Sequence, residues 1–304
     1  MTVPFPENMS ADRRNRVLEA QARVAKFIAQ QKGGRAEGVI LNAVAPNGSI
    51  ATDADQRLGA PQINNGLKAK KNGLSKAALR HAIAVSQGHL KPDTPISAVP
   101  RDLVLLRAPT SPAAEQFRNI RTHLATSSFA QDMAAMAIVS PNKYRPADFV
   151  AMNLGAGFAQ LGHRVLIIDA DMRHRRMERI FKLSAPANLR AVLENKMAAT
   201  EAVLETVVPN LSVLPSGPAV EDPQPLFAAD RFAEVLESIR YRFDRILVLS
   251  PPFGAVADGR FIWKACEGAF VVVRRHQDRT HDLVKLQRAL REVETTAIGS
   301  LLVQ

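Results

Sequence analysis

The sequence predicts an α/β fold, with a mainly parallel sheet covered by helices on both faces. Three observations indicate this fold class. Short, wholly apolar runs of strand length recur in the second two thirds of the chain, segments of helical periodicity alternate with them, and several runs end on polar residues such as Ser140 and Asp169. Continuous apolar runs are typical of parallel strands that are buried on both faces. Their alternation with helices is the pattern of an α/β domain.

The centre of this domain is a predicted strand–loop–helix–strand unit. We expect strands at residues 137–139 and 164–168, the loop at 140–146 and the helix at 147–161, with Asp169 and Asp171 directly after the second strand. Ligands of such sheets bind at the carboxyl ends of the strands. The remaining predicted elements are a helix from Ser111 to about residue 127, strands at 211–214, 245–249, 269–273 and 298–303, and helices at 230–242, 258–265 and 279–293.

The chain before this domain is different in character. Residues 10–31 have an amphipathic helical pattern, residues 33–73 are rich in Gly, Asn and other turn signals, and residues 74–88 suit a second short helix. We therefore expect a partly helical, partly disordered N-terminal region over residues 1–99 and the α/β domain over residues 100–304.

The N-terminal region is also basic. The net charge of the chain is +11, and residues 1–100 hold 14 Lys and Arg against 7 Asp and Glu. A solvated tail, an acidic partner and an anionic membrane surface are all consistent with this charge. Nucleic acid is not expected as a partner, because aromatic residues are few and no nucleic-acid-binding motif is present.

Composition excludes several other classes. The single cysteine, Cys266, cannot form an internal disulfide, and its place in an apolar pattern predicts a buried core thiol. Neither a membrane-spanning apolar run nor a secretory signal is seen, so we expect a cytoplasmic protein. His81 and His89 lack ligand spacing to other metal-binding side chains, so no metal site is predicted.

Several segments of residues 100–304 match one known pattern in order and spacing. They are SP at 111–112 with Glu115, Arg118 and Arg121, VSP at 139–141, NL at 153–154, FAQLG at 158–162, VLIIDADMR at 165–173, LSVLPSG at 211–217, PQPL at 223–226, and FDRILVLSPP at 243–252 followed by Asp258. Together they resemble the cytoplasmic domain of the bacterial tyrosine kinases of capsule and exopolysaccharide synthesis. The resemblance implies a P-loop NTPase-like fold that binds ATP and Mg²⁺.

The phosphate loop departs from the family pattern. Aligned on SPxPGEGK followed by Ser or Thr, residues 144–148 read Tyr144, Arg145, Pro146, Ala147 and Asp148. A phosphate-cradling loop needs inward N–H groups and no side chain in the way. Tyr144 and Pro146 replace glycines, Ala147 replaces the phosphate-binding lysine, and Asp148 replaces the Mg²⁺-binding hydroxyl. The resemblance thus places a degenerate cofactor loop at these five residues.

A second departure lies far away in the sequence. Leu249 stands where the family has an aspartate on the Mg²⁺ side, and an apolar residue cannot organise hydrated Mg²⁺. We therefore expect no bound cofactor and no phosphoryl transfer. The positions Ala147, Asp148, Asp169, Asp171 and Leu249 would be relics of a catalytic site.

Two groups of residues keep two interpretations each. Asp169 and Asp171, which the family uses at the metal and the attacking hydroxyl, are either relic polar residues paired with Arg173 or Arg145, or a residual site for an ion or a nucleotide. On the predicted helix, Glu115, Arg118 and Arg121 are spaced at i, i+3 and i+6. They form either a solvated ion-pair surface or, by the resemblance, a subunit contact of a homo-oligomer.

The functional hypothesis is a pseudokinase-like accessory protein of exopolysaccharide or capsule biosynthesis and export. By the resemblance it would lie at the cytoplasmic side of the inner membrane and dock on a membrane chain-length or co-polymerase protein. One alternative is a divergent nucleotide-binding switch, or a tyrosine kinase that still binds ATP or ADP with Mg²⁺. A second alternative is a relative of the partition-like positioning ATPases.

Overall fold

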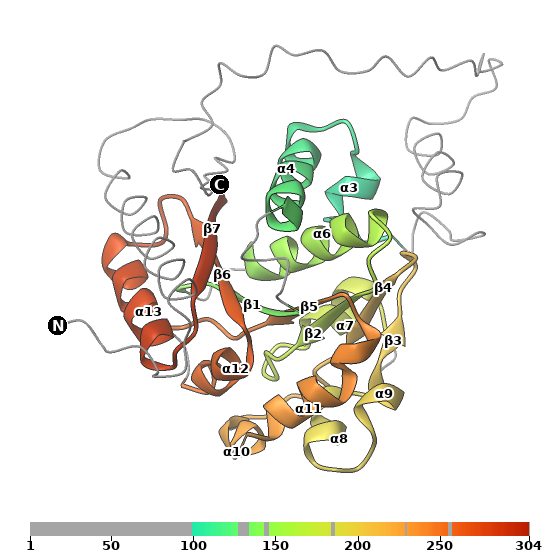
Figure 1. Cartoon of the computed structure of the whole chain (residues 1–304), viewed down its shortest axis with the longest axis vertical. Helices are drawn as coiled ribbons and strands as arrows, with labels where there is room; N and C mark the ends of the chain where they lie inside the picture. Colours follow the sequence, from blue (N-terminus) through green and yellow to red (C-terminus); the bar gives the residue numbers. More distant parts are fainter. Residues whose placement is uncertain are drawn as a thin grey trace.

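The structure, a computed structural model, describes residues 99–126, 134–142, 146–183, 186–228, 230–254 and 257–303. The predictions for residues 1–98 lie outside these residues. A seven-stranded sheet runs through the domain in the order β3-β4-β2-β5-β1-β6-β7 (Figure 1). The strands are β1 (Ala135–Val139), β2 (Val165–Asp169), β3 (Leu204–Glu205), β4 (Leu211–Leu214), β5 (Arg245–Leu249), β6 (Gly268–Arg274) and β7 (Ala297–Val303).

All neighbouring strands are parallel except β3 and β4, which are antiparallel. The prediction of a mainly parallel α/β sheet is therefore confirmed. Its helices are α3 (Val104–Arg107), α4 (Pro112–Thr126), α6 (Pro146–Gln160), α7 (Arg176–Phe181), α8 (Leu189–Leu193), α9 (Ala199–Ala202), α10 (Gln224–Phe227), α11 (Arg231–Ile239), α12 (Gly259–Ala265) and α13 (Thr280–Glu292), with a 3₁₀ turn, η3 (Arg240–Arg242).

Helices cover both faces of the sheet, as the continuous apolar runs require. Along β1, Ile138 packs into one core with α3, α4, α6 and α7, and its neighbour Val139 packs into the other core with α8 to α13. Successive strand residues point to opposite faces, so a strand with a core on each side must be apolar at every position. Figure 1 shows α4 and α6 on one side of the sheet and α11 and α12 on the other.

The helix that follows β1 is held in place by a buried amide. Asn153 of α6 is inaccessible to solvent. Its Oδ1 accepts a hydrogen bond from the Val104 N–H (2.9 Å), and its Nδ2 donates to the carbonyls of Asp102 (2.9 Å) and Phe149 (3.0 Å). Because a buried amide needs partners for both its ends, this contact joins α6 firmly to the start of α3.

Some local predictions need correction. The helix predicted over 147–161 ends one residue earlier, at Gln160; the chain turns at Gly162 with φ +88°, and Leu161 is 50% exposed. The short helices α7 to α10 and the two-residue strand β3 were not predicted. Two other predictions are confirmed. The helix predicted from Ser111 is present as α4, with Ser111 Oγ accepting the Ala114 N–H at 3.2 Å, and Cys266 is buried, which raises the pKa of its thiol.

None of the helices in the described residues is both long enough and apolar enough to span a bilayer.

Candidate functional site at the carboxyl rim of the sheet

The predicted site residues meet at the carboxyl ends of three adjacent strands. Leu249 at the end of β5 is in register with Ile138 of β1 on one side and with Asp169 of β2 on the other. The first residues of α6, Pro146, Ala147 and Asp148, follow the loop after β1. Parallel strands end at one edge of a sheet, so these groups are brought together as the sequence predicted.

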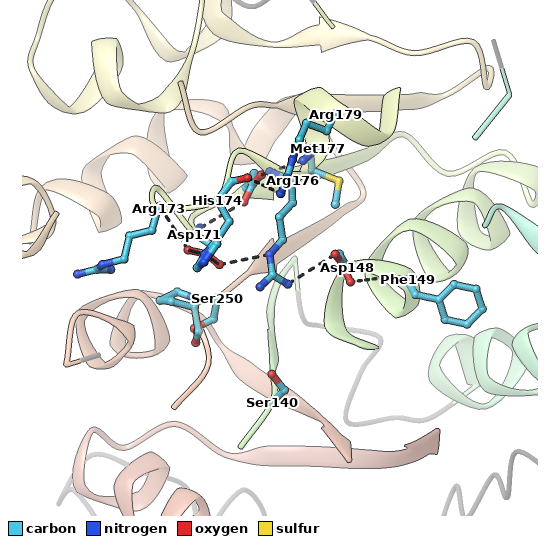
Figure 2. A network of polar contacts seen from close by, with 12 residues as sticks. Ser140, Asp148, Phe149, Asp171, Arg173, His174, Arg176, Met177, Arg179 and Ser250 are labelled. Atoms are coloured by element: carbon cyan, nitrogen blue, oxygen red, sulfur yellow. Dashed lines mark hydrogen bonds and ion pairs between the residues drawn. The ribbon is translucent and has the colours of Figure 1, made fainter. Parts of the chain in front are cut away.

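An arginine from α7 fills the centre of this rim. Figure 2 shows the Arg176 side chain reaching between two carboxylates, Asp171 after β2 and Asp148 in the first turn of α6. Its Nε lies 3.4 Å from Asp171 Oδ2, and its Nη1 lies 3.5 Å from Asp148 Oδ2. The exposed fractions of the three side chains are only 8% for Arg176, 10% for Asp148 and 1% for Asp171. The positive charge between the two carboxylates is thus the guanidinium of Arg176.

A further carboxylate at the rim, Asp169, binds the start of α7 through hydrogen bonds. Its Oδ2 accepts the backbone N–H groups of Arg176 (2.8 Å) and Met177 (2.9 Å), and its Oδ1 accepts the Asp171 N–H at 3.3 Å. The chain reaches this geometry through Arg175, whose backbone is left-handed with φ +46°. The carboxylate therefore takes up N–H groups that a helix start leaves without intrahelical partners.

Burial makes Asp169 a weak acid. Removal from water, which penalises the charged form, raises the pKa of Asp169 to about 7, and the neighbouring Asp171 charge adds to the rise. The two hydrogen bonds from α7 and the charge of Arg176 act in the opposite direction. The carboxyl group of Asp169 is thus fully enclosed.

The predicted partner of the strand-end aspartates is corrected by the structure. Arg173 does not pair with either Asp169 or Asp171: its Nη1 lies 2.9 Å from Asp258 Oδ2, and Asp258 is 2% exposed. The ring of His174 lies 2.9 Å from Asp171 instead. Asp171 thus has Arg176 as its ion-pair partner, whereas Asp169 binds the backbone N–H groups of Asp171, Arg176 and Met177. The other predicted partner, Arg145, lies outside the described residues, as does Tyr144.

The end of β5 is apolar. Leu249 is inaccessible and packs in the core beneath α6. The next residue, Ser250, accepts a hydrogen bond at Oγ from the buried Trp263 Nε1 at 2.7 Å. Both positions are thereby committed to packing. Ala147, which aligns with the lysine of the family pattern, is also buried, with 2% of its surface exposed.

The first part of the loop after β1 is bound to the far side of the rim. Asn142 Nδ2 donates to Asp278 Oδ1 (2.8 Å) and lies 3.3 Å from Asp282 Oδ2, at the start of α13. The Gly254 N–H bonds to the Pro141 carbonyl at 2.9 Å. Contacts therefore hold the loop at both of its described ends, through Asn142 and through Asp148.

The α4 residues lie away from this rim. Arg118 pairs with Glu115 at 2.5 Å, with side chains 31% and 62% exposed, and also donates to the Pro109 carbonyl. Arg121 instead turns toward α6, where its Nη1 donates to the Gly157 carbonyl at 3.3 Å, and burial lowers its pKa. Two of the three residues thus remain at the surface, and the third is partly used in packing.

Arg176 is the site residue that sequence reasoning missed. It belongs to the run RHRRMER at residues 173–179, in which nothing in composition distinguishes the arginine that points inward. The available signal is position, because a residue that opens a helix directly after a polar strand end faces the rim. Among the described residues, no group of three or more His, Cys, Asp or Glu side chains is arranged to hold a metal ion.

Comparison with known proteins supports one family. A family model for an AAA domain matches residues 149–295. The chain is 27% identical over 194 residues to the putative tyrosine-protein kinase CapB of Staphylococcus aureus, covering 64% of this chain and 85% of CapB. It is 28% identical over 206 residues to the tyrosine-protein kinase YwqD of Bacillus subtilis, covering 68% and 87%. The solved BceF tyrosine kinase domain is 26% identical, with a TM-score of 0.61, over 75% of this chain and 88% of that domain.

Proposed function

We propose that this chain is a catalytically inactive member of the family to which it belongs, the bacterial tyrosine-protein kinases within the P-loop ATPases. It would act by docking to other proteins in capsule or exopolysaccharide synthesis. The observation that carries this proposal is the position of Arg176, between the carboxylates of Asp148 and Asp171 at the carboxyl rim of the sheet.

The charges at this position suit an internal cation. A phosphate site presents N–H groups and a lysine to an anion. Here the start of α6 carries Asp148 and is already paired with Arg176. An incoming triphosphate would meet the Asp148 carboxylate, and an incoming Mg²⁺ would have to displace a guanidinium from Asp148 and Asp171. Both exchanges cost free energy, because buried charges that lose their partners are strongly destabilising.

Backbone and apolar residues support the same proposal. Pro146 opens α6 and has no N–H to offer a phosphate. Leu249 lies between β1 and β2 at the metal side of the rim and offers no oxygen ligand, which Mg²⁺ prefers. The described residues at this rim therefore do not fit a magnesium–nucleotide complex.

The cellular role follows from the family. We propose that the protein lies on the cytoplasmic side of the inner membrane, peripheral to it, and docks on a polysaccharide co-polymerase or chain-length protein. The intact fold would supply the docking surface after the chemistry was lost. The exposed Glu115–Arg118 pair of α4 is the proposed contact in a homo-oligomer, and Arg121 would position the helix.

Titration calorimetry of the full chain with ATP or ADP and Mg²⁺ tests the inactive state. We expect no saturable heat and no thermal shift, whereas a ligand at 100 times its Kd would stabilise the fold by about 2.7 kcal/mol. A catalytically competent relative is the positive control. Saturable binding without hydrolysis would favour a nucleotide-sensing switch, and tyrosine phosphorylation by the purified chain would contradict the proposal. A deletion strain with normal polysaccharide output would contradict the pathway assignment.

A further inference from the structure

The outer face of α13 carries a row of exposed basic side chains. The helix packs Leu283, Leu286, Ala289 and Leu290 into the core at one end of the sheet, near β6 and β7 (Figure 1). Its outward side chains, together with the residue that precedes the helix, are all exposed. We call six of these residues the α13 basic face, a definition that leaves out the exposed Glu292: Arg279, His281, Val284, Lys285, Arg288 and Arg291.

The acidic residues of this segment neutralise the face only in part. Asp278 and Asp282 bind Asn142, and Asp278 also accepts the Arg274 N–H at 2.6 Å. The other oxygen of Asp282, Oδ1, lies 3.7 Å from His281 Nδ1. Glu292 pairs with Arg260 (2.7 Å) and Arg288 (3.3 Å). Within the described parts of the chain, Arg279, Lys285 and Arg291 have no ion-pair partner. Positive charge therefore accumulates on one side of one helix.

An aliphatic side chain lies in the middle of this charge. Val284 is 51% exposed, and on a helix it is adjacent to His281 and Arg288. An apolar centre with a basic rim is the chemistry of a helix that lies on a membrane surface, where cations meet lipid phosphates and the apolar group reaches the acyl boundary. A nucleic-acid backbone would use the cations but not the valine, and the face has no Phe, Tyr or Trp side chain for stacking on bases.

We propose that the α13 basic face binds the surface of a bilayer that contains anionic lipid. This inference rests on the proposed role at the inner membrane and identifies which side of the domain would face the lipid. It requires no nucleotide, no partner protein and no change in the sheet. The matching partner surface is a row of lipid phosphates with accessible acyl carbons.

Co-sedimentation of the full chain with vesicles tests the proposal. The probe is a set of vesicles of phosphatidylcholine alone or with phosphatidylglycerol. We expect binding to the anionic vesicles only, weakened by high salt. Each basic residue near an anionic surface contributes about 1 kcal/mol, which is roughly fivefold in affinity. The double variant Lys285→Gln/Arg291→Gln should therefore bind about 25-fold more weakly.

A matched control separates this face from net charge. Arg101→Gln/Arg242→Gln removes the same charge from exposed positions elsewhere in the domain and leaves the basic N-terminal region intact, so its binding should stay within about twofold of the parent. Val284→Ser should weaken binding by about fivefold, since half of the side chain is available for burial. Urea unfolding of each variant should match the parent, because exposed substitutions change stability by roughly 0.5 kcal/mol or less.

Three results would overturn the inference: equal binding to neutral vesicles, an α13 variant that binds like its control, or loss of duplex DNA binding by the α13 variant with vesicle binding unchanged. None of them depends on nucleotide or on polysaccharide output. Failure of this proposal is therefore distinguishable from failure of the proposed function.

Discussion

Two sets of arginines and carboxylates in this domain have very different surroundings. At the rim, Arg176 contacts Asp148 and Asp171 with side chains that are at most 10% exposed. On α4, Arg118 contacts Glu115 at a shorter distance, 2.5 Å, with side chains 31% and 62% exposed. Burial, and not distance, decides what such contacts contribute: an exposed pair contributes about 0–1 kcal/mol, whereas breaking a buried pair costs about 3–5 kcal/mol.

The largest effect is expected at Arg176. Arg176→Met removes the cation and leaves Asp148 and Asp171 buried without it, so the free energy of unfolding at pH 7 should fall by about 3–5 kcal/mol. Equilibrium urea unfolding measures this change. The triple variant Arg176→Met/Asp148→Asn/Asp171→Asn should recover much of the loss, because the two buried carboxylate charges that Arg176 contacts are removed with it. A loss below 1 kcal/mol in the single variant would show that the rim is more hydrated than its burial indicates.

The next effect is on pH dependence. The pKa of Asp169 is about 7 in the fold against 3.8 for the ordinary group. Between pH 4 and pH 7 the native state therefore holds a proton that the unfolded state has released, and stability falls as pH rises through this window. The slope is about 1.4 kcal/mol per pH unit. Asp169→Asn should abolish this contribution, as measured by urea unfolding at a series of pH values.

A matched control for the pH experiment is Asp244. Its hydrogen bond with Arg164 lowers the pKa of Asp244 to about 2, so its contribution appears above the ordinary pKa and is lost as pH falls toward 2. Asp244→Asn should leave the slope between pH 4 and pH 7 unchanged. If both variants flatten the same window, the titrating group is not Asp169.

A neutral contact at the same rim should give an intermediate effect. Ser250→Ala leaves the buried Trp263 N–H without its acceptor and should cost about 1–3 kcal/mol in the free energy of unfolding. The shift in Tm measures it. In a double-mutant cycle with Trp263→Phe, the Ser250→Ala step should become nearly neutral. An equal cost in both backgrounds would mean that packing, and not the hydrogen bond, is responsible.

The smallest stability effect is expected on α4. Arg118→Ala should change the free energy of unfolding by less than about 1 kcal/mol, since the pair with Glu115 is exposed. If α4 forms the proposed subunit contact, the same variant should shift self-association in light scattering as a function of concentration. Thr122→Ala, one turn further along α4, is the control. Unchanged association in Arg118→Ala would remove this surface from the proposed oligomer.

The sequence predicted the sheet well because burial on both faces imposes a local rule. Each residue of β2 and β5 between the strand ends must be apolar, so the runs are visible without knowledge of their neighbours. The short helices α7 and α10, of six and four residues, span too few turns to show a period of 3.6 residues. Antiparallel β3 has only two residues and no apolar run.

The site was predicted only in part, for a related reason. Asp169, Asp171 and Leu249 could be placed because they end strands. The partner of Asp171 could not, because Arg173, Arg175, Arg176 and Arg179 have the same chemistry in sequence. Which of them turns inward is decided by the left-handed backbone of Arg175 and by the N–H groups that Asp169 binds. That choice is tertiary, and residue type alone does not encode it.

The strand order has a consequence for folding during synthesis on the ribosome. β5 lies between β2 and β1, and it is synthesised long after both. Until β5 emerges, Ala135 and Val165 belong to strands that lack their shared neighbour, and apolar edges of both remain open. Long-range parallel pairing is slow, and open edges invite aggregation. Completion of β5 thus joins β1 to the part of the sheet that holds β2, β4 and β3, before β6 and β7 are added. A nascent chain that stalls before residue 245 would be a substrate for chaperones.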